Sequence, residues 1–266
     1  MPGVRLAAIV LALLAASPAA AQEAQQRKPV GSGEKTVTGQ KVIADGHLDL
    51  GPRFVGGRWT IQVRDDASTP PVWRKLPDLV MHAVDAARVR VPAGFPFLGR
   101  AGARVWLLPQ VQKRGILWPG WNTQDPAVAD RAVREVTWRL HGVRGPGRFV
   151  LFLTDAFGEP RILFDSARPH PQETGIDVDT HVHGNWAFTA PGVYALDIEM
   201  RARLKDGATV SDRAALRFAV GSGDPAAAFE EEEGSDPVWL WVVGGFGIGG
   251  GAAAGVLFLR RRTGAG

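Results

Sequence analysis

Short stretches in which apolar and polar residues alternate fill the chain from Lys41 to Gly221. Glycine, proline and aspartate separate these stretches, as in RWTIQVRDD, EVTWRLHGV and RFVLFLTD. Successive side chains of a β-strand point to opposite faces, so this alternation is typical of strands with one buried face. Helical periodicity is hard to find in the same region. The pattern predicts an all-β fold, and strands this short and frequent favour a β-sandwich.

The alternating region is about 180 residues long, enough for one large β domain or for two subdomains that split near residues 125–134. Its second half, Arg134 to Gly221, is typical of an immunoglobulin-like unit. A KDG turn at Lys205–Gly207 joins a long strand to a closing strand. Tyr194, the only tyrosine of the chain, comes just after the Pro191-Gly192 pair, where a tyrosine corner would lie.

The two ends of the chain predict export and membrane anchoring. Residues 1–21 combine a basic residue, an apolar core and an A-x-A cleavage pattern, which are typical of a signal peptide. Residues 238–259 carry no charge, and as a helix they would extend about 33 Å, enough to cross a bilayer. Arginines follow this span, so residues 260–266 are expected to form a cytoplasmic tail. The pattern predicts a single-pass type I protein of the cell membrane, with its ectodomain outside the cell.

Polar segments flank the alternating region on both sides. Residues 22–40 are expected to be a flexible N-terminal segment, and residues 222–236 an acidic disordered linker.

In the apolar span, GFGIGG matches a dinucleotide-binding fingerprint but lacks the soluble strand before it and the acidic residue after it. Glycines in this span instead form a G-x-x-x-G ladder that could pair two helices in a dimer, although small residues also accumulate in such spans by chance. The ladder consists of Gly247, Gly251 and Gly255.

The net charge of the chain does not indicate a nucleic-acid partner, because the excess of basic residues lies outside the exported part. The formal net charge of +4 would suit a nucleic-acid-binding protein. However, Arg5 and Arg260–Arg262 account for the whole excess of basic residues, so the exported part is neutral. Cysteine is absent from the sequence, which excludes thiolate metal ligands and cysteine nucleophiles.

Several motifs resemble a known family of surface proteins. GHLDLGPRF (46–54), FLGRAGARVWLLPQVQ (97–112), LWPGWNT (117–123), GPGRFVLFLTDAFGEPRILFDS (145–166) and HVHGNW (181–186) occur in the order found in the actinobacterial surface-anchored, or choice-of-anchor M, domain. The resemblance covers residues 41–221. It implies a surface location, a β-rich fold and association with the substrate-binding component of an ABC transporter, with metal ions as the favoured cargo. The chain has one HVHGNW unit and no LPxTG-type sorting signal, unlike the multi-repeat, wall-linked members of the family.

Histidines and aspartates at a spacing of two residues form the candidate metal site. His181 and His183 would lie on one face of an extended strand, about 7 Å apart at Cα. His47 and Asp49 repeat the spacing and could add a nitrogen and a carboxylate oxygen. Imidazole with carboxylate suits Zn, Mn, Fe or Ni. Asp179 could also ligate, or orient a histidine. The alternative is that these histidines face solvent or bond to loop carbonyls.

Other histidines and tryptophans give weaker candidates. His82 is expected to be a partly buried residue with a satisfied hydrogen bond, His141 a surface residue of a strand, and His170 a loop residue. Trp118 and Trp121 flank a Pro-Gly pair interpreted as a turn. Most tryptophans are expected in the core, while Trp121 and Trp186 are candidate pocket walls. Exposed indoles would favour a glycan-binding or structural module as the alternative function.

Enzymatic motifs are missing from the sequence. Neither G-x-S-x-G nor H-E-x-x-H occurs, and no paired acid and base can be inferred from spacing. The chain is therefore expected to be a binding protein without catalytic residues or an organic cofactor. A hydrolytic metal centre that uses the same histidines, with Asp49 or Asp179 as general base, is the remaining alternative.

Overall fold

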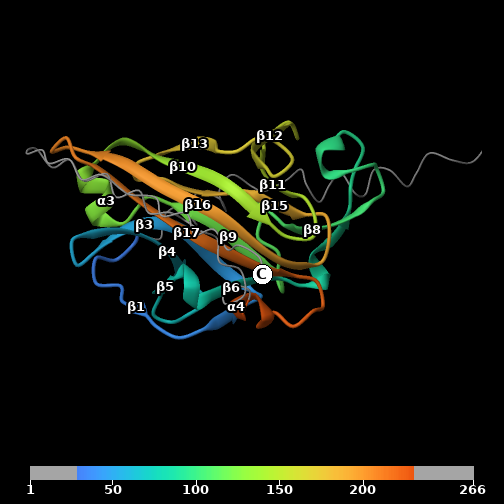
Figure 1. The fold of residues 1–266 in the computed structure, drawn as a ribbon, viewed down its shortest axis with the longest axis horizontal. Helices are drawn as coiled ribbons and strands as arrows, with labels where there is room; N and C mark the ends of the chain where they lie inside the picture. Colours follow the sequence, from blue (N-terminus) through green and yellow to red (C-terminus); the bar gives the residue numbers. More distant parts are fainter. Residues whose placement is uncertain (1–28, 231–266) are drawn as a thin grey trace, which may run out of the picture. The chain divides into compact units, whose positions relative to one another are not determined.

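The alternating stretches form β-strands in the computed structural model, which describes residues 29–230 (Figure 1). The strands make three sheets, and helices are limited to short turns, so the all-β prediction is confirmed for this part of the chain. The expected signal peptide, membrane span and cytoplasmic tail, with Gly247, Gly251 and Gly255, lie outside the described residues. Among residues 29–230, none of the helices has the length and apolar character needed to cross a bilayer.

Sheet A carries the candidate site. Its strands, in spatial order, are β1 (Thr36–Val37), β5 (Val72–Lys75), β4 (Arg58–Asp65), β3 (Gly46–Val55), β9 (Leu117–Asn122) and β14 (His181–His183). β3 and β4 form an antiparallel hairpin, whereas β3 and β9 run parallel. β14 pairs antiparallel with β9 and ends the sheet. The sheet therefore joins segments that are more than a hundred residues apart in the sequence.

Sheet B contains the longest strands, β10, β16 and β17, which run side by side (Figure 1). Its strands, in spatial order, are β13 (Gln172–Asp177), β10 (Ala132–Arg144), β16 (Gly192–Leu204), β17 (Thr209–Val220), β6 (Leu79–Ala83) and β2 (Lys41–Ile43). On β16, Leu196, Ile198 and Met200 are buried and alternate with polar residues, as the sequence predicts. Lys205–Gly207 lies between β16 and β17, as expected for the hairpin turn.

Sheet C is antiparallel throughout. Its strands, in spatial order, are β12 (Pro160–Asp165), β11 (Phe149–Thr154), β15 (Asn185–Phe188), β8 (Arg104–Leu108) and β7 (Arg88–Arg90). Only Gly184 separates β14 of sheet A from β15 of sheet C, so the HVHGNW motif crosses from one sheet to the next. A Cβ at Gly184 would lie 3.0 Å from the Trp121 ring and 3.1 Å from Leu151, which explains the small residue at the crossing.

One large hydrophobic core connects the three sheets. Leu48 and Leu50 of sheet A, Ile198 of sheet B, and Phe149 and Trp186 of sheet C all belong to it. Each sheet contains strands from both sides of residues 125–134, and the described residues belong to one compact unit. A smaller cluster covers the other face of sheet C, where Phe95 and Leu98 pack against Leu107 and Val150.

The described parts of the two flanks, residues 29–40 and 222–230, include segments that pack on the sheets, where composition predicts flexible chain. The short helices are η1 (Leu76–Asp78), η2 (Asp85–Ala87), η3 (Pro96–Leu98), α3 (Pro126–Arg131) and α4 (Ala227–Glu230). Ala228 of α4 is buried against Val80 and Ala219, because alanine is small enough to pack directly on sheet B. At the other end, Val30 is buried and β1 pairs with β5. Residues 30–37 and 227–230 are therefore part of the fold.

Tyr194 makes the hydrogen bond expected of a tyrosine corner, since its hydroxyl donates to the carbonyl of Ala190 at 2.8 Å. The side chain is fully buried. Replacing Tyr194 with phenylalanine removes this bond and the contact of the hydroxyl with the backbone of Gly147, so we expect a loss of about 1 to 2 kcal/mol in the free energy of unfolding. Urea unfolding followed by tryptophan fluorescence would measure it. An unchanged midpoint and slope would contradict this role.

Candidate metal centre

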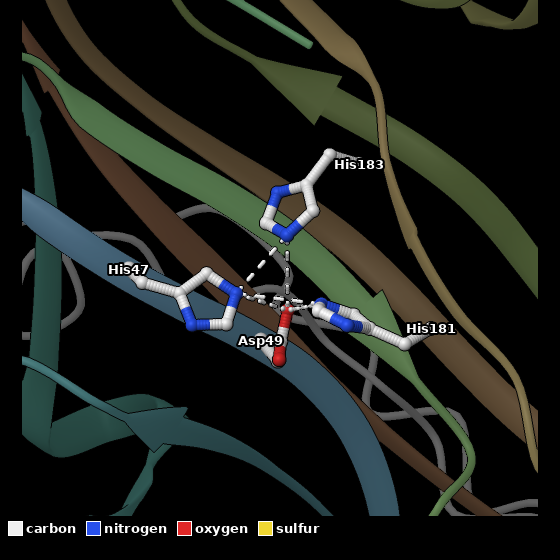
Figure 2. Close-up of side chains that lie close together, drawn as sticks. All are labelled: His47, Asp49, His181 and His183. Carbon is white, nitrogen blue, oxygen red and sulfur yellow. Dashed lines mark hydrogen bonds and ion pairs between the residues drawn. The ribbon is translucent and has the colours of Figure 1, made fainter. Parts of the chain in front are cut away.

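Side chains from two strands of sheet A converge on one point (Figure 2). His47 and Asp49 come from β3, and His181 and His183 come from β14. The spacing of two residues places both members of each pair on one face of its strand, as the sequence predicts. β9 lies between β3 and β14, and its Gly120 pairs with Asp49 on one side and with His183 on the other.

The ligand atoms lie at distances that suit coordination of a single ion. All four are within 4.8 Å of one another. The Nε2 atom of His47 is 3.3 Å from Nε2 of His181 and 3.0 Å from Nε2 of His183. The Oδ1 atom of Asp49 is 2.9, 3.2 and 3.9 Å from the Nε2 atoms of His181, His47 and His183. Three imidazole nitrogens and one carboxylate oxygen thus surround the same point.

This polar group is buried, although it does not belong to the hydrophobic core. The exposed fractions of its four side chains are 7% or less. Leu48 and Leu50 alternate with His47 and Asp49 on β3 and face the core, so the site occupies the opposite face of the strand. Burying polar groups is costly unless they are paired or hold an ion. These four buried polar side chains must therefore be stabilised by pairing with one another or by a bound ion.

Gly120 provides the space in which Asp49 and His183 meet. A Cβ atom at this position would lie 2.6 Å from Oδ1 of Asp49, 2.7 Å from Cε1 of His183 and 2.8 Å from the carbonyl oxygen of Val182. Each distance is shorter than ordinary van der Waals contact. The site can therefore form across β9 only because this strand has no side chain at its middle.

Asp66 supports the site from the turn after β4. Its Oδ2 atom lies 2.6 Å from Nδ1 of His47, while Nη1 of Arg64 donates to the same oxygen at 3.1 Å. A histidine that donates Nδ1–H to a carboxylate presents the lone pair of Nε2 to a metal. Asp66 therefore orients His47. The sequence offers Asp179 for such a role, as the alternative to direct ligation.

An indole lies against the imidazoles of the site. The rings of Trp118 and His183 are stacked, with centroids 3.7 Å apart and planes at 10°. Nε1 of Trp118 donates to the carbonyl of Gln110 at 3.0 Å, which holds the indole in place. The ring of His47 also contacts Trp118, with centroids 5.1 Å apart. Trp118 therefore restricts the orientation of two histidines and excludes water from one side of the site.

Protonation differs sharply among the clustered groups. Burial disfavours the charged form of His47, but hydrogen bonds and charges of Asp49 and Asp66 outweigh it and raise the pKa of His47 to about 9. Burial lowers the pKa of His183 to about 3, and the charges of His47 and His181 add to this effect against that of Asp49. Burial also opposes ionisation of Asp49, yet hydrogen bonds from His181 and His47 hold its pKa well below the usual range.

The remaining candidates from the sequence lie elsewhere. Asp179 is exposed in the turn before β14, with φ of 62°, and does not join the group. His82 Nε2 lies 2.8 Å from the carbonyl of Gly221, the satisfied contact expected for this residue. His141 pairs with Glu199 on sheet B at 2.8 Å. His170 lies in a loop, as expected, with its Nε2 buried.

The tryptophans interpreted as pocket walls are part of the core. Trp121 and Trp186 are buried in the central cluster, with ring centroids 6.4 Å apart. Pro119-Gly120 lies within β9 instead of forming a turn. The alternation of the strand therefore points Trp121 away from Trp118 and the site. Every tryptophan of residues 29–230 is buried, so the exposed row of indoles required by the glycan-binding alternative does not occur in this part of the chain.

Comparison of the chain with protein-family models, with curated proteins and with solved structures finds no match. The resemblance to surface-anchored domains therefore stays a prediction from the sequence motifs.

Proposed function

We propose that this protein binds a divalent transition-metal ion, with zinc preferred, through His47, Asp49, His181 and His183. The convergence of three imidazole Nε2 atoms and one carboxylate oxygen, from strands joined only by tertiary structure, is the observation that carries this proposal. These residue types are common ligands of zinc and of other first-row divalent ions. With four protein ligands, the site would hold an ion in tetrahedral geometry, so the role proposed is capture of the ion and not catalysis.

The distances between ligand atoms support an ion of this size. Nitrogen and oxygen ligands about 2.0 to 2.1 Å from zinc lie about 3.3 to 3.4 Å apart in a tetrahedron. The five distances given above run from 2.9 to 3.9 Å and include this value. Octahedral ions such as Mn²⁺ would also tolerate the shorter ones, but nitrogen-rich sites bind zinc more tightly than iron or manganese.

Buried charges on this face of sheet A favour a divalent cation. The face and the segment over it contain two cations and four carboxylates in one network, namely Arg53, Arg64, Glu34, Asp49, Asp66 and Asp125. Their formal charges sum to −2 when the histidines are neutral. A bound divalent ion would bring this network to neutrality, which matters because an uncompensated charge is costly in a buried position.

Metal analysis of the full-length protein tests the proposal. We expect close to one zinc ion per chain after purification with zinc present, and a titration of chelator-treated protein in which zinc binds more tightly than iron(II) and iron(II) more tightly than manganese(II). Failure of all three metals to bind stoichiometrically would refute the proposed function.

Zinc binding is expected to release about one proton per chain at pH 7.5. Below a pKa of about 9, His47 carries a proton that a metal ligand must lose. The apparent affinity should therefore rise with pH and level off near pH 9. Isothermal titration calorimetry in two buffers with different ionisation enthalpies measures the release, and a binding heat that does not depend on the buffer would contradict it.

The cellular setting remains part of the proposal. The apolar span at residues 238–259 supports a cell-membrane protein with an external ectodomain. Residues 1–21 support a cleaved signal peptide. The surface-domain motifs support a relay of metal to an ABC transporter. The Lys205–Gly207 turn and the Tyr194 hydrogen bond support an immunoglobulin-like second half.

A further inference from the structure

The N-terminal segment 30–37 lies over the same face of sheet A as the metal site. Arg53 on β3 donates from Nη2 to the carbonyl of Glu34 at 3.2 Å, and the amide of Trp73 donates to the carbonyl of Lys35 at 2.9 Å. Val30 is buried, and β1 adds only two residues to the edge of the sheet. Because its strand pairing is so short, this segment depends largely on polar contacts for its position.

The carboxylate of Glu34 is the centre of those contacts. Arg64 donates to it twice, from Nη2 at 2.6 Å and from Nε at 2.8 Å. Nε1 of Trp73 and the amide of Gly31 donate to it at 2.9 and 3.0 Å. This two-point pairing fixes the plane of the Arg64 guanidinium group.

The same guanidinium group reaches the metal site. Nη1 of Arg64 lies 3.0 and 3.1 Å from the two carboxylate oxygens of Asp66, and Oδ2 of Asp66 lies 2.6 Å from Nδ1 of His47. The Nε2 atom of His47 is one of the four converging ligand atoms. An unbroken series of charge-assisted contacts thus runs from Glu34 through Arg64 and Asp66 to a metal ligand.

We propose that Glu34 is a positioning residue of the metal site and that metal binding, in return, holds segment 30–37 on sheet A. This inference rests on the metal-binding function proposed above. Glu34 sets the orientation of Arg64, which holds Asp66 in place to accept the Nδ1 proton of His47. Supporting groups of this kind change metal affinity by about 10- to 100-fold when removed.

Segment docking and metal binding must strengthen each other, so their coupling can be measured at the segment as well as through zinc affinity. If docking of the segment strengthens metal binding, metal binding must strengthen docking by the same factor. Zinc should therefore slow hydrogen exchange in residues 30–37, which form no part of the coordination sphere. A purely structural role for Glu34 would stabilise the fold without this response.

The experiment compares zinc affinity and hydrogen exchange in the full-length wild-type protein, in Glu34→Gln and in Arg64→Lys. Lysine keeps the charge at position 64 but cannot contact both carboxylates with a planar fork. We expect each variant to bind zinc about tenfold more weakly and to lose the zinc-dependent protection of residues 30–37. The double variant should bind zinc no more weakly than either single variant, because the two residues act in one series.

Asp165→Asn serves as the matched control. Arg148 donates to both oxygens of Asp165, from Nε at 2.7 Å and from Nη2 at 2.5 Å, in an ion pair away from the site. Loss of this pair should reduce stability while leaving zinc affinity and the protection of residues 30–37 unchanged.

Each outcome decides between the two proposals. Wild-type protein that binds zinc without any change in exchange at residues 30–37, or a Glu34→Gln variant with wild-type affinity, overturns the positioning role alone. A control that loses affinity as much as Glu34→Gln also overturns it, because the effect would then follow general stability. Wild-type protein that binds no zinc overturns the metal site and this inference together.

Discussion

Replacing His181 and His183 together with alanine is expected to abolish stoichiometric zinc binding. Structural zinc sites with four protein ligands are worth about 10 to 16 kcal/mol at neutral pH. Two of the four ligands would account for about half of this, so the loss in affinity should be at least about 10³-fold. His47 and Asp49 would remain on β3, but two ligands from one strand cannot enclose an ion.

The metal-free double variant should stay folded, which separates ligation from structure. Both imidazoles lie on the polar face of sheet A, outside the hydrophobic core. Competition with a chromophoric zinc chelator measures the affinity, and urea unfolding in the presence of a strong chelator measures the stability.

The double variant His82→Ala and His141→Ala is the appropriate control, because it removes the same number of histidines from positions with other partners. It should keep wild-type zinc affinity. Equal loss of zinc from both double variants would show that the metal depends on the overall fold or binds elsewhere.

The fold class follows from the sequence because alternation is a local property. β10 and β16 each bury every second residue along much of their length, and the printed sequence shows the same period. The pairing of strands is different, because it depends on contacts between distant segments. Nothing in the local sequence places β9 between β3 and β14, and this arrangement decides whether the four ligands meet.

The supporting carboxylate could have been found from the sequence. Gly56-Gly57 is a two-residue turn signal, and it sets the register of the β3–β4 hairpin with Val55 opposite Arg58. Counting outward from this turn places Arg64 opposite Asp49 and Asp66 opposite His47, as the structure has them. Asp179, the candidate that proximity to His181 in the chain suggests, does not join the group.

Which tryptophan of β9 faces the site and which faces the core was harder to predict than the fold class. Pro-Gly usually marks a turn, so Trp118 and Trp121 were both expected at its ends. In the structure β14 ends opposite Gly120, so Pro119 needs no partner on that side and β9 continues through it. The two indoles, three residues apart, then point to opposite faces, with Trp118 at the site and Trp121 in the core.

Replacing Gly120 with alanine is expected to lower zinc affinity by about 100-fold without removing any ligand. The added methyl group would have to displace Asp49, His183 or the backbone of Val182, each less than 3 Å away. Overpacking of this kind costs about 1 to 3 kcal/mol, and displaced ligands can no longer meet around one ion. Zinc competition and urea unfolding of the metal-free variant measure the two effects separately.

Gly142→Ala is the matched control, because Gly142 lies on β10 with no atom within 4 Å of the position that its Cβ would occupy. It should keep both affinity and stability, since alanine suits a strand at least as well as glycine. If Gly120→Ala binds zinc as tightly as this control, the ligands do not meet across β9 in the way described. If instead it folds normally and loses zinc, the absence of a side chain at one position of β9 is what allows residues from β3 and β14 to form a single site.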